Sequence, residues 1–253
     1  MSASLGPKLS FSTYRVQDID YSALKKKLTA FQIEKLTFFF TKFFDVKGHG
    51  VLEKKSFAEL NEKLRSIAGW EVDSDEFKRL VDNSNVFWEC LLDQVRVEHS
   101  QFCEGLELRT WEEALKPKKL QIDTVDLNGW LNMWAKLFDG AAGMDDFPIW
   151  VQLLPNILFD VQGGNKNGYI KKESLHEFYA NFSKAQDSDL DKLTEAGYNT
   201  MTSNGEYQLD LNNYKLLFAN FLLGRTIYGP GKFVFGCFDN SDLQKPYQII
   251  YEE

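Results

Sequence analysis

The chain contains few of the residues that interrupt helices or build disulfide frameworks. There are 6 prolines and 3 cysteines among its 253 residues. Proline disrupts helix interiors and central strands, so its scarcity is compatible with long helices. An odd number of widely spaced cysteines does not suit a disulfide framework and favours a reducing compartment. We therefore expect a cytoplasmic protein that folds without disulfides.

Long apolar runs and basic patches are also missing. No stretch approaches the roughly 18 apolar residues that a membrane span requires, and the N-terminus lacks the features of a secretory signal. The formal net charge of −8 disfavours nucleic acid and anionic membranes as partners. The sequence thus predicts a protein with no membrane span and no nucleic-acid partner. Its 43% of hydrophobic residues are enough for one compact body or two closely packed lobes.

Aromatic residues are abundant, and many of them fall at helical spacing. The chain has 21 Phe, 10 Tyr and 6 Trp. The segment 45–50, DVKGHG, breaks the pattern, and a second amphipathic run follows over residues 57–64. This order predicts a helix, a short loop and a second helix. The stripe before the loop consists of Leu36, Phe39, Phe40, Phe43 and Phe44.

Four pairs of apolar residues share a separation of five positions. In an EF-hand, the first member of such a pair lies in the small β-bridge between two loops, and the second begins the exiting helix. We therefore predict an all-α fold in which four helix–loop–helix units form two EF-hand-pair lobes packed into one compact body. The pairs are Leu52/Phe57, Leu106/Trp111, Ile170/Leu175 and Leu209/Tyr214.

These units divide the chain into five segments. We expect an N-terminal extension over residues 1–30 and an N-terminal EF-hand pair over 31–116. A connector over 117–146 contains a helix capped near Asp126. A second EF-hand pair is expected over 147–224, and residues 225–253 form a tail that packs on the body.

With these units aligned, residues 33–238 resemble the invertebrate sarcoplasmic calcium-binding proteins, a four-EF-hand family that includes the calexcitins. The similarity rests on DVKGHGVL from position 45, LFDVQGGNKNGYI from 158, QLDLNNYKLLFANF from 208 and FVFGCF from 233. It implies a two-lobed helical protein of the cytoplasm that is non-enzymatic, often forms a homodimer, and buffers calcium or takes part in signalling.

The first and third loops retain the turn glycine of an EF-hand but few oxygen ligands. Calcium takes six to eight oxygens, which the loop supplies from positions 1, 3, 5, 7 and 9 and from a bidentate Glu at 12. Lys47 stands at position 3 of the loop 45–56, and the loop 163–174 has no carboxylate at any ligand position. The remaining candidate metal ligands are Asp45, His49, Glu53, Asp160, Asn165 and Asn167, of which Asp160 lies three residues before the third loop.

We do not expect calcium at the second and fourth loops either, and charge acts against a cation in the first and third. Placing the second loop at His99 puts Gln101 and Cys103 at ligand positions. The first loop has two acidic and three lysine residues, a balance of +1, and the third has one acidic and three lysine residues, a balance of +2. We therefore expect no physiological calcium binding. Position 12 of the four loops is occupied by Ser56, Thr110, Ser174 and Asn213, none of which chelates as a bidentate carboxylate does.

The aromatic content leaves two alternatives open. The rings could simply fill two cores, or they could line a pocket for an apolar ligand. Coelenterazine-binding proteins and photoproteins of the EF-hand superfamily hold an apolar ligand between their lobes. The candidate lining residues here are Phe40, Phe43, Trp88, Trp111, Trp134, Trp150, Phe178 and Phe218.

The sequence therefore favours a non-enzymatic, EF-hand-like protein with degenerate calcium loops. It would serve as a scaffold or carrier for a protein partner or an apolar small molecule. One alternative is a calcium buffer of the sarcoplasmic type. Another is a ligand-modifying enzyme like the juvenile hormone diol kinases, although GGNKNG at 163–168 lacks the Gly-Lys-Ser/Thr ending of a phosphate loop. No catalytic residue stands out.

Overall fold

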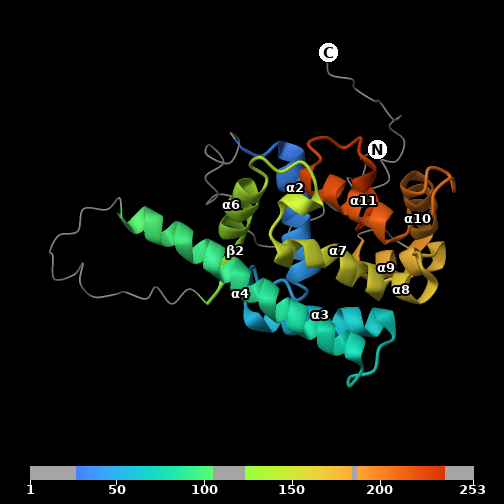
Figure 1. Cartoon of the computed structure of the whole chain (residues 1–253), viewed down its shortest axis with the longest axis horizontal. Helices are drawn as coiled ribbons and strands as arrows, with labels where there is room; N and C mark the ends of the chain where they lie inside the picture. The colour runs from blue at the N-terminus through green and yellow to red at the C-terminus, as the bar shows by residue number, and fades with distance from the viewer. Residues whose placement is uncertain (1–26, 105–122, 184–186, 237–253) are drawn as a thin grey trace, which may run out of the picture.

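A computed structural model describes residues 27–104, 123–183 and 187–236. Nearly every element in these ranges is a helix, and α2 lies in the middle of the molecule in contact with α6 and α11 (Figure 1). The predicted all-α class is therefore confirmed. Most of the predicted N-terminal extension, and the tail after residue 236, lie outside the described residues.

The first helix–loop–helix unit has the predicted form. Helix α2 (Ala30–Phe38) begins at Thr29, whose hydroxyl accepts a hydrogen bond from the Gln32 amide, so that the first turn is capped. A π-helix, η2 (Phe39–Phe44), continues α2 and carries four buried phenylalanines. After the loop come the short strand β1 (Val51–Leu52) and helix α3 (Lys54–Ala68).

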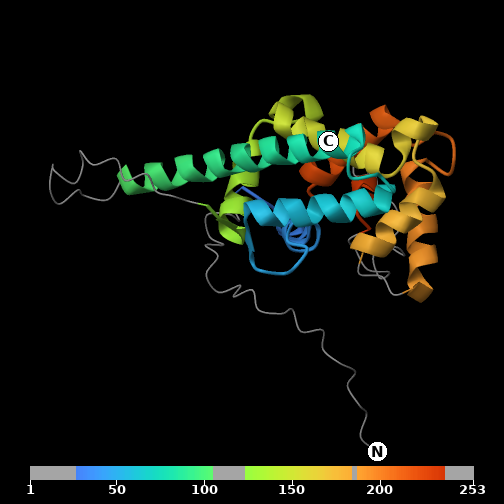
Figure 2. The ribbon, with the colours of Figure 1, turned by 90° about the horizontal axis from the view of Figure 1, so that it is seen from below.

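The second unit begins with the long helix α4 (Asp75–Glu104), which runs beside α3 (Figure 2). It ends with strand β2 (Val125–Asp126) and helix α6 (Leu127–Leu137). Strands β1 and β2 pair antiparallel, with Leu52 opposite Val125. This two-residue ladder is the bridge that joins the two loops of an EF-hand pair.

The predicted second loop is wrong. His99, Gln101 and Cys103 lie within α4 rather than in a loop. The partner of Leu52 is Val125, and Trp130 follows Val125 by the same five positions as in the other units. The helix capped by Asp126 is therefore the exiting helix of the second unit. Leu106, Thr110 and Trp111, which the prediction placed there, lie outside the described residues; the exact limits of the lobes stay a prediction.

The third unit consists of α7 (Ile149–Val161), the four-residue α8 (Gly164–Asn167) and α9 (Lys172–Phe182). A single 3₁₀ turn, η3 (Met144–Asp146), precedes it. Pro155 lies inside α7, which nevertheless continues to Val161.

The fourth unit pairs with the third as the spacing predicts. It contains α10 (Asp187–Met201) and α11 (Leu211–Leu223), followed by the 3₁₀ turn η4 (Pro230–Phe233). The Ile170 amide donates to the Leu209 carbonyl at 2.9 Å, which links position 8 of the two loops.

Side chains of α2 tie the first unit to the end of α11. Thr29 Oγ1 donates to the Arg225 carbonyl at 3.1 Å, and Gln32 Nε2 donates to the Leu223 carbonyl at 3.1 Å. Lys35, 1% exposed, places its ammonium on the Gly224 carbonyl at 2.7 Å and on the Phe221 carbonyl. A cation at the C-terminal end of a helix is favourable because the unpaired carbonyls there carry partial negative charge.

Candidate functional site

The first loop is closed by its own carboxylate. Asp45, which an EF-hand would use as its first calcium ligand, is 1% exposed. Its Oδ1 accepts a hydrogen bond from the His49 amide at 2.8 Å, and its Oδ2 accepts one from the Gly50 amide at 2.8 Å. Both oxygens thus bind loop backbone, and the loop keeps its curvature through this pair of charge-assisted hydrogen bonds.

The other predicted ligands of the first loop point to other partners. Glu53 is the residue before α3 and lies 2.9 Å from the ammonium of Lys55. Ser56, at position 12, is buried, and its hydroxyl accepts a hydrogen bond from the Glu53 amide at 3.2 Å. His49 is exposed. The structure therefore brings Asp45 into the loop centre but does not gather His49 and Glu53 around it.

The third loop is filled by a turn of helix. Residues that would present ligands at positions 3 and 5 lie in α8, between Gly163 and Gly168, both of which have positive φ. Asn165 is exposed, and the Asn167 amide nitrogen donates to the Gly163 carbonyl at 2.9 Å. Around Gly163, the turn is held by backbone and amide groups.

Asp160 does not return to the third loop. It lies near the C-terminal end of α7, half-buried, with Glu76 and Arg79 of α4 as its charged neighbours. Burial raises the pKa of its carboxyl group, Arg79 partly offsets that increase, and Glu76 adds to it. Asp160 therefore belongs to the contact between α4 and α7 rather than to a metal site.

In the second and fourth units, the acidic residue at position 9 caps a helix. Asp126 Oδ1 accepts from the Gly129 amide at 2.8 Å at the start of α6. Asp210 Oδ1 accepts from the Asn213 amide at 2.9 Å at the start of α11. In the described residues of the two loops, these carboxylates bind backbone N–H groups, as N-cap residues do. Within the described residues no cluster of three or more His, Cys, Asp or Glu side chains could hold a metal ion.

The predicted pocket residues that the structure describes are buried, and they fall into three neighbouring groups within one continuous hydrophobic core. Phe43, Phe178 and Phe218 surround Phe235, with ring centroids 5.1 to 6.2 Å from its ring. Phe40 and Trp134 pack on Trp130. Trp88 contacts Phe57, and Trp150 contacts Phe87. Trp111 lies outside the described residues.

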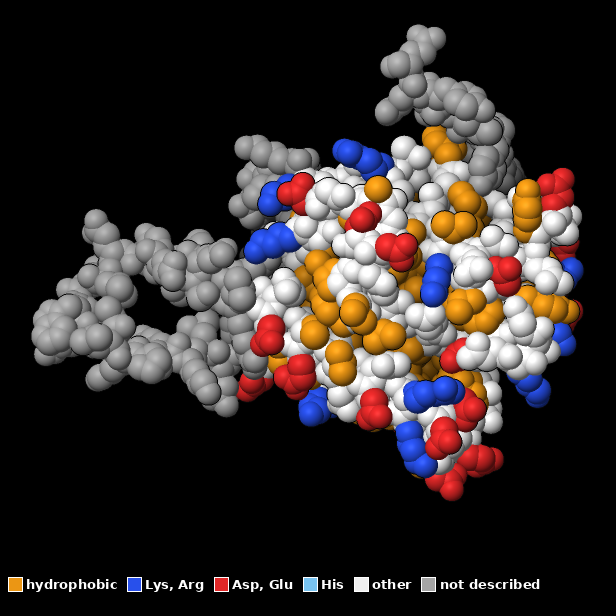
Figure 3. Space-filling model, in the orientation of Figure 1, with side chains coloured by type: hydrophobic (Ala, Val, Ile, Leu, Met, Phe, Trp, Pro, Cys, Tyr) orange, Lys and Arg blue, Asp and Glu red, His pale blue; other side chains and the backbone are white. Residues whose placement is uncertain are grey.

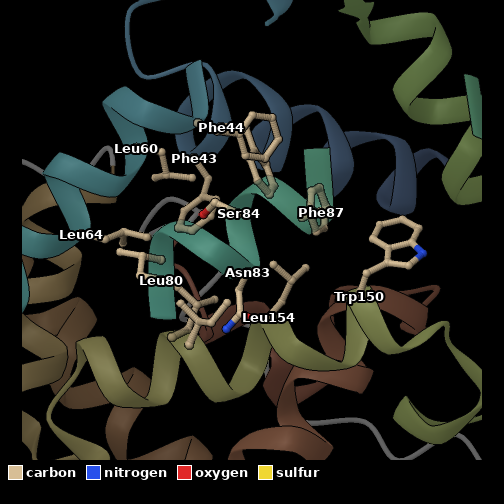
Figure 4. A pocket seen from close by; sticks show the side chains of 13 residues that line it. Phe43, Phe44, Leu60, Leu64, Leu80, Asn83, Ser84, Phe87, Trp150 and Leu154 are labelled. Carbon is tan, nitrogen blue, oxygen red and sulfur yellow. The ribbon is translucent and has the colours of Figure 1, made fainter. Parts of the chain in front are cut away.

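A small cavity lies near the last of these groups, between η2, α3, α4 and α7 (Figure 4). Phe43 and Trp150 line it, together with Phe87 and the polar side chains of Asn83 and Ser84. Its volume of about 20 Å³ holds no more than a water or two, whereas ligand pockets usually measure about 300–1,000 Å³. At this cavity the described aromatic side chains leave no room for a ligand of that size.

No protein-family model matches the chain. The chain is 23% identical over 208 residues to each of two groups of sarcoplasmic calcium-binding proteins from Branchiostoma lanceolatum. One group comprises proteins I, III and IV, and the other comprises proteins II, V, VI and VII. The match covers 80% of this chain and 98% of those proteins. The chain is a divergent relative of the sarcoplasmic calcium-binding proteins.

Solved structures show the same fold. A sarcoplasmic calcium-binding protein from amphioxus superimposes with a TM-score of 0.64 and 22% identity, covering 87% of this chain and all of that one. A coelenterazine-binding protein from Renilla muelleri, in its calcium-loaded apo form, superimposes with a TM-score of 0.51 and 12% identity, covering 83% and 97% of the two chains.

The surface of this divergent relative mixes charge and apolar groups. On the face shown in Figure 3, acidic and basic side chains are interspersed, with apolar side chains exposed between them. Ile149 at the start of α7 is 73% exposed, and Val86 in α4 is 49% exposed. None of the helices in the described ranges has the length and hydropathy to span a bilayer.

Two important residues were missed by sequence reasoning. Phe235 lies at the centre of the aromatic interior, with five phenylalanine rings within 6.2 Å of its own ring. Trp130 lies in the first turn of α6, the true exiting helix of the second unit. The spacing from Val125 to Trp130 is visible in the sequence and could have located that unit, whereas no local pattern marks Phe235 as central.

Proposed function

We propose that this chain is a non-enzymatic binding protein whose EF-hand pairs keep their shape without calcium. The observation that carries this proposal is the closure of the first loop, where both oxygens of the buried Asp45 carboxylate accept backbone hydrogen bonds. A calcium ion would have to compete with the His49 and Gly50 amides for those oxygens. It would gain no bidentate carboxylate, because position 12 is Ser56.

The electrostatic balance of the loops supports the same proposal. The first loop, residues 45–56, contains three lysines and two acidic residues, and two of the lysines lie at the start of α3. An excess of positive charge in a loop disfavours a cation, although solvent and salt screen the exposed charges. The Asn165 and Asn167 side chains of the third loop supply no negative charge against its lysines.

Calorimetric titration with calcium tests this part of the proposal. We expect no heat of binding at micromolar calcium and no change in the thermal unfolding midpoint when calcium or a chelator is added. A ligand that binds only the folded state raises that midpoint, so a calcium-dependent midpoint would overturn the proposal.

We further propose that the bound species is a small apolar molecule. The aromatic interior joins the first, third and fourth units around one ring, and a protein with the same fold is named for binding coelenterazine. Aromatic walls bind apolar molecules through area and ring contacts. A scaffold for a protein partner, with or without formation of a homodimer, is the other binding role that this fold could serve in the cytoplasm.

Native mass spectrometry of the purified full chain distinguishes these outcomes. A co-purifying organic mass is expected for a carrier. Bound calcium would instead favour the second candidate function, a calcium buffer, which the names of the Branchiostoma relatives suggest. A bare monomer or dimer would favour the scaffold.

A further inference from the structure

Phe235 fills the centre of the space that an apolar ligand would need. Its side chain is fully buried, although it comes from an irregular segment and not from a helix. We call residues 229–236 the hook. Five phenylalanine rings surround the Phe235 ring, with centroid distances of 4.8 to 6.2 Å, and they belong to η2, α9 and α11. They are Phe39, Phe43, Phe178, Phe218 and Phe221.

The geometry of these rings suits an aromatic guest. Their planes make angles of 40° to 64° with the Phe235 ring, so edges and faces alternate around it. Tilted and edge-to-face contacts are the arrangements that aromatic rings prefer. Withdrawal of Phe235 would leave a dry site, walled by rings on several sides, with room for a planar ring in its place.

Hydrogen bonds to α9 and α11 help to hold the hook. The Tyr179 hydroxyl of α9 donates to the Phe233 carbonyl, and the Gly231 amide donates to Asn220 Oδ1 at 2.8 Å. Gly236, at φ +58°, lets the backbone pass the Tyr179 ring, where an added Cβ would lie 2.9 Å from Cδ1. The other rings that surround Phe235 belong to helices, whereas Phe235 lies in a turn after η4. Release of the hook would move η4 and leave α9 and α11 in place.

We propose that the Phe235 position is the binding site for a planar, apolar aromatic molecule, which enters by displacing the hook. This inference rests on the carrier function proposed above and adds the site, the ligand class and the element that moves. In the ligand-free protein, Phe235 occupies the place of the ligand. The measured affinity is then the intrinsic affinity reduced by the small fraction of molecules in which the hook is released.

Fluorescence titration of the full chain with N-phenyl-1-naphthylamine, a neutral aromatic probe, tests this proposal. Tyr179→Phe removes the hydrogen bond to the hook with little change in core volume. Losing one such bond should raise the released fraction, and hence the probe affinity, about fivefold. Tyr214→Phe is the matched control, because its buried hydroxyl bonds to Gln162 and does not touch the hook. We expect the control to bind the probe as the wild type does.

Equal probe affinities in all three proteins, or equal increases in both variants, would overturn the hook site. The first result would mean that the probe enters elsewhere, and the second that any loosening of the core suffices. Absence of probe binding in all three would overturn it too. In each case the native mass spectrum decides separately whether the carrier function survives.

Hydrogen exchange of the wild type provides a measurement that does not depend on a variant folding. The Val234 amide donates to the Gly231 carbonyl at 3.0 Å, and the Gly236 amide donates to the Phe233 carbonyl at 3.3 Å. Saturating probe should speed exchange in peptides that cover the hook, while peptides from α3 remain unchanged. Slower or unchanged exchange in the hook would contradict its displacement.

Discussion

The first and third loops keep the same EF-hand curvature by different chemistry. In the first, one buried carboxylate gathers two backbone amides; in the third, a short helical turn between two left-handed glycines occupies the ligand positions. An EF-hand loop normally relies on its ion to bring these groups together. Under the function proposed above, a side chain in one loop and backbone structure in the other do what the ion does in an EF-hand, with different consequences for mutation.

The two loop pairs also differ in the backbone hydrogen bonds that join their loops. The first pair is joined by a two-residue antiparallel ladder, and the described contacts of the second include a single backbone hydrogen bond between Ile170 and Leu209. In both pairs the apolar residue at position 8 is fully buried. Both pairs thus keep the bridge, whose residues belong to the hydrophobic core, although the neighbouring ligand positions differ from those of a standard EF-hand loop.

The largest expected change in stability comes from a substitution in the first loop. Asp45→Ala removes the acceptor of two charge-assisted hydrogen bonds in a buried site, which should lower the free energy of unfolding by about 3 kcal/mol. For a chain of this size, that corresponds to a decrease of about 6–12 °C in the unfolding midpoint. The control is Asn165→Ala in the third loop, whose exposed side chain should contribute less than about 0.5 kcal/mol. Equal losses in the two variants would show that the loops are not closed differently.

An intermediate effect is expected from the third loop. Gly164→Ala would place a Cβ 2.4 Å from the Phe159 ring, a clash that should cost about 1–3 kcal/mol. Gly48→Ala in the first loop is the matched control. Its added Cβ meets no atom within 4 Å, so only the left-handed backbone, at φ +71°, should cost about 1 kcal/mol. Thermal or denaturant unfolding measures the stability of both variants. A larger loss of stability in Gly48→Ala than in Gly164→Ala would contradict the idea that close packing matters more in the third loop.

The smallest effect is a pH-dependent one at Asp160, the carboxylate next to the third loop. Burial raises the pKa of Asp160 in the folded state, so the folded state binds this proton more tightly than the unfolded state does. The native state therefore becomes less stable as the pH rises and the carboxyl group ionises. Asp160→Asn should therefore stabilise the protein at neutral pH, by less than about 1 kcal/mol for a half-buried group. The gain should vanish below the ordinary carboxyl pKa of 3.8, where both states are protonated. A variant that is less stable at pH 7 would indicate that Asp160 is favourable in its ionised form.

The local parts of the fold could be predicted from the sequence. The helical stripe that ends at Phe44, the bridge residues Leu52, Ile170 and Leu209, and the cap at Asp126 all follow from spacing or residue type within one element. The second unit could not be located in the same way, because α4 continues through the region where its loop was expected. Its identity depends on which segment pairs with β1, and that choice is made by contacts far apart in the chain.

For the candidate site, the sequence by itself determined which oxygens are missing, since ligand type and position are properties of each loop. Only the tertiary structure decided which groups hold each loop closed. Whether Asp45 binds amides or a metal, and whether Asp160 faces a loop or α4, depends on backbone paths that no local pattern fixes. The same is true of Phe235, because a residue becomes the centre of a core only when helices from separate units close around it.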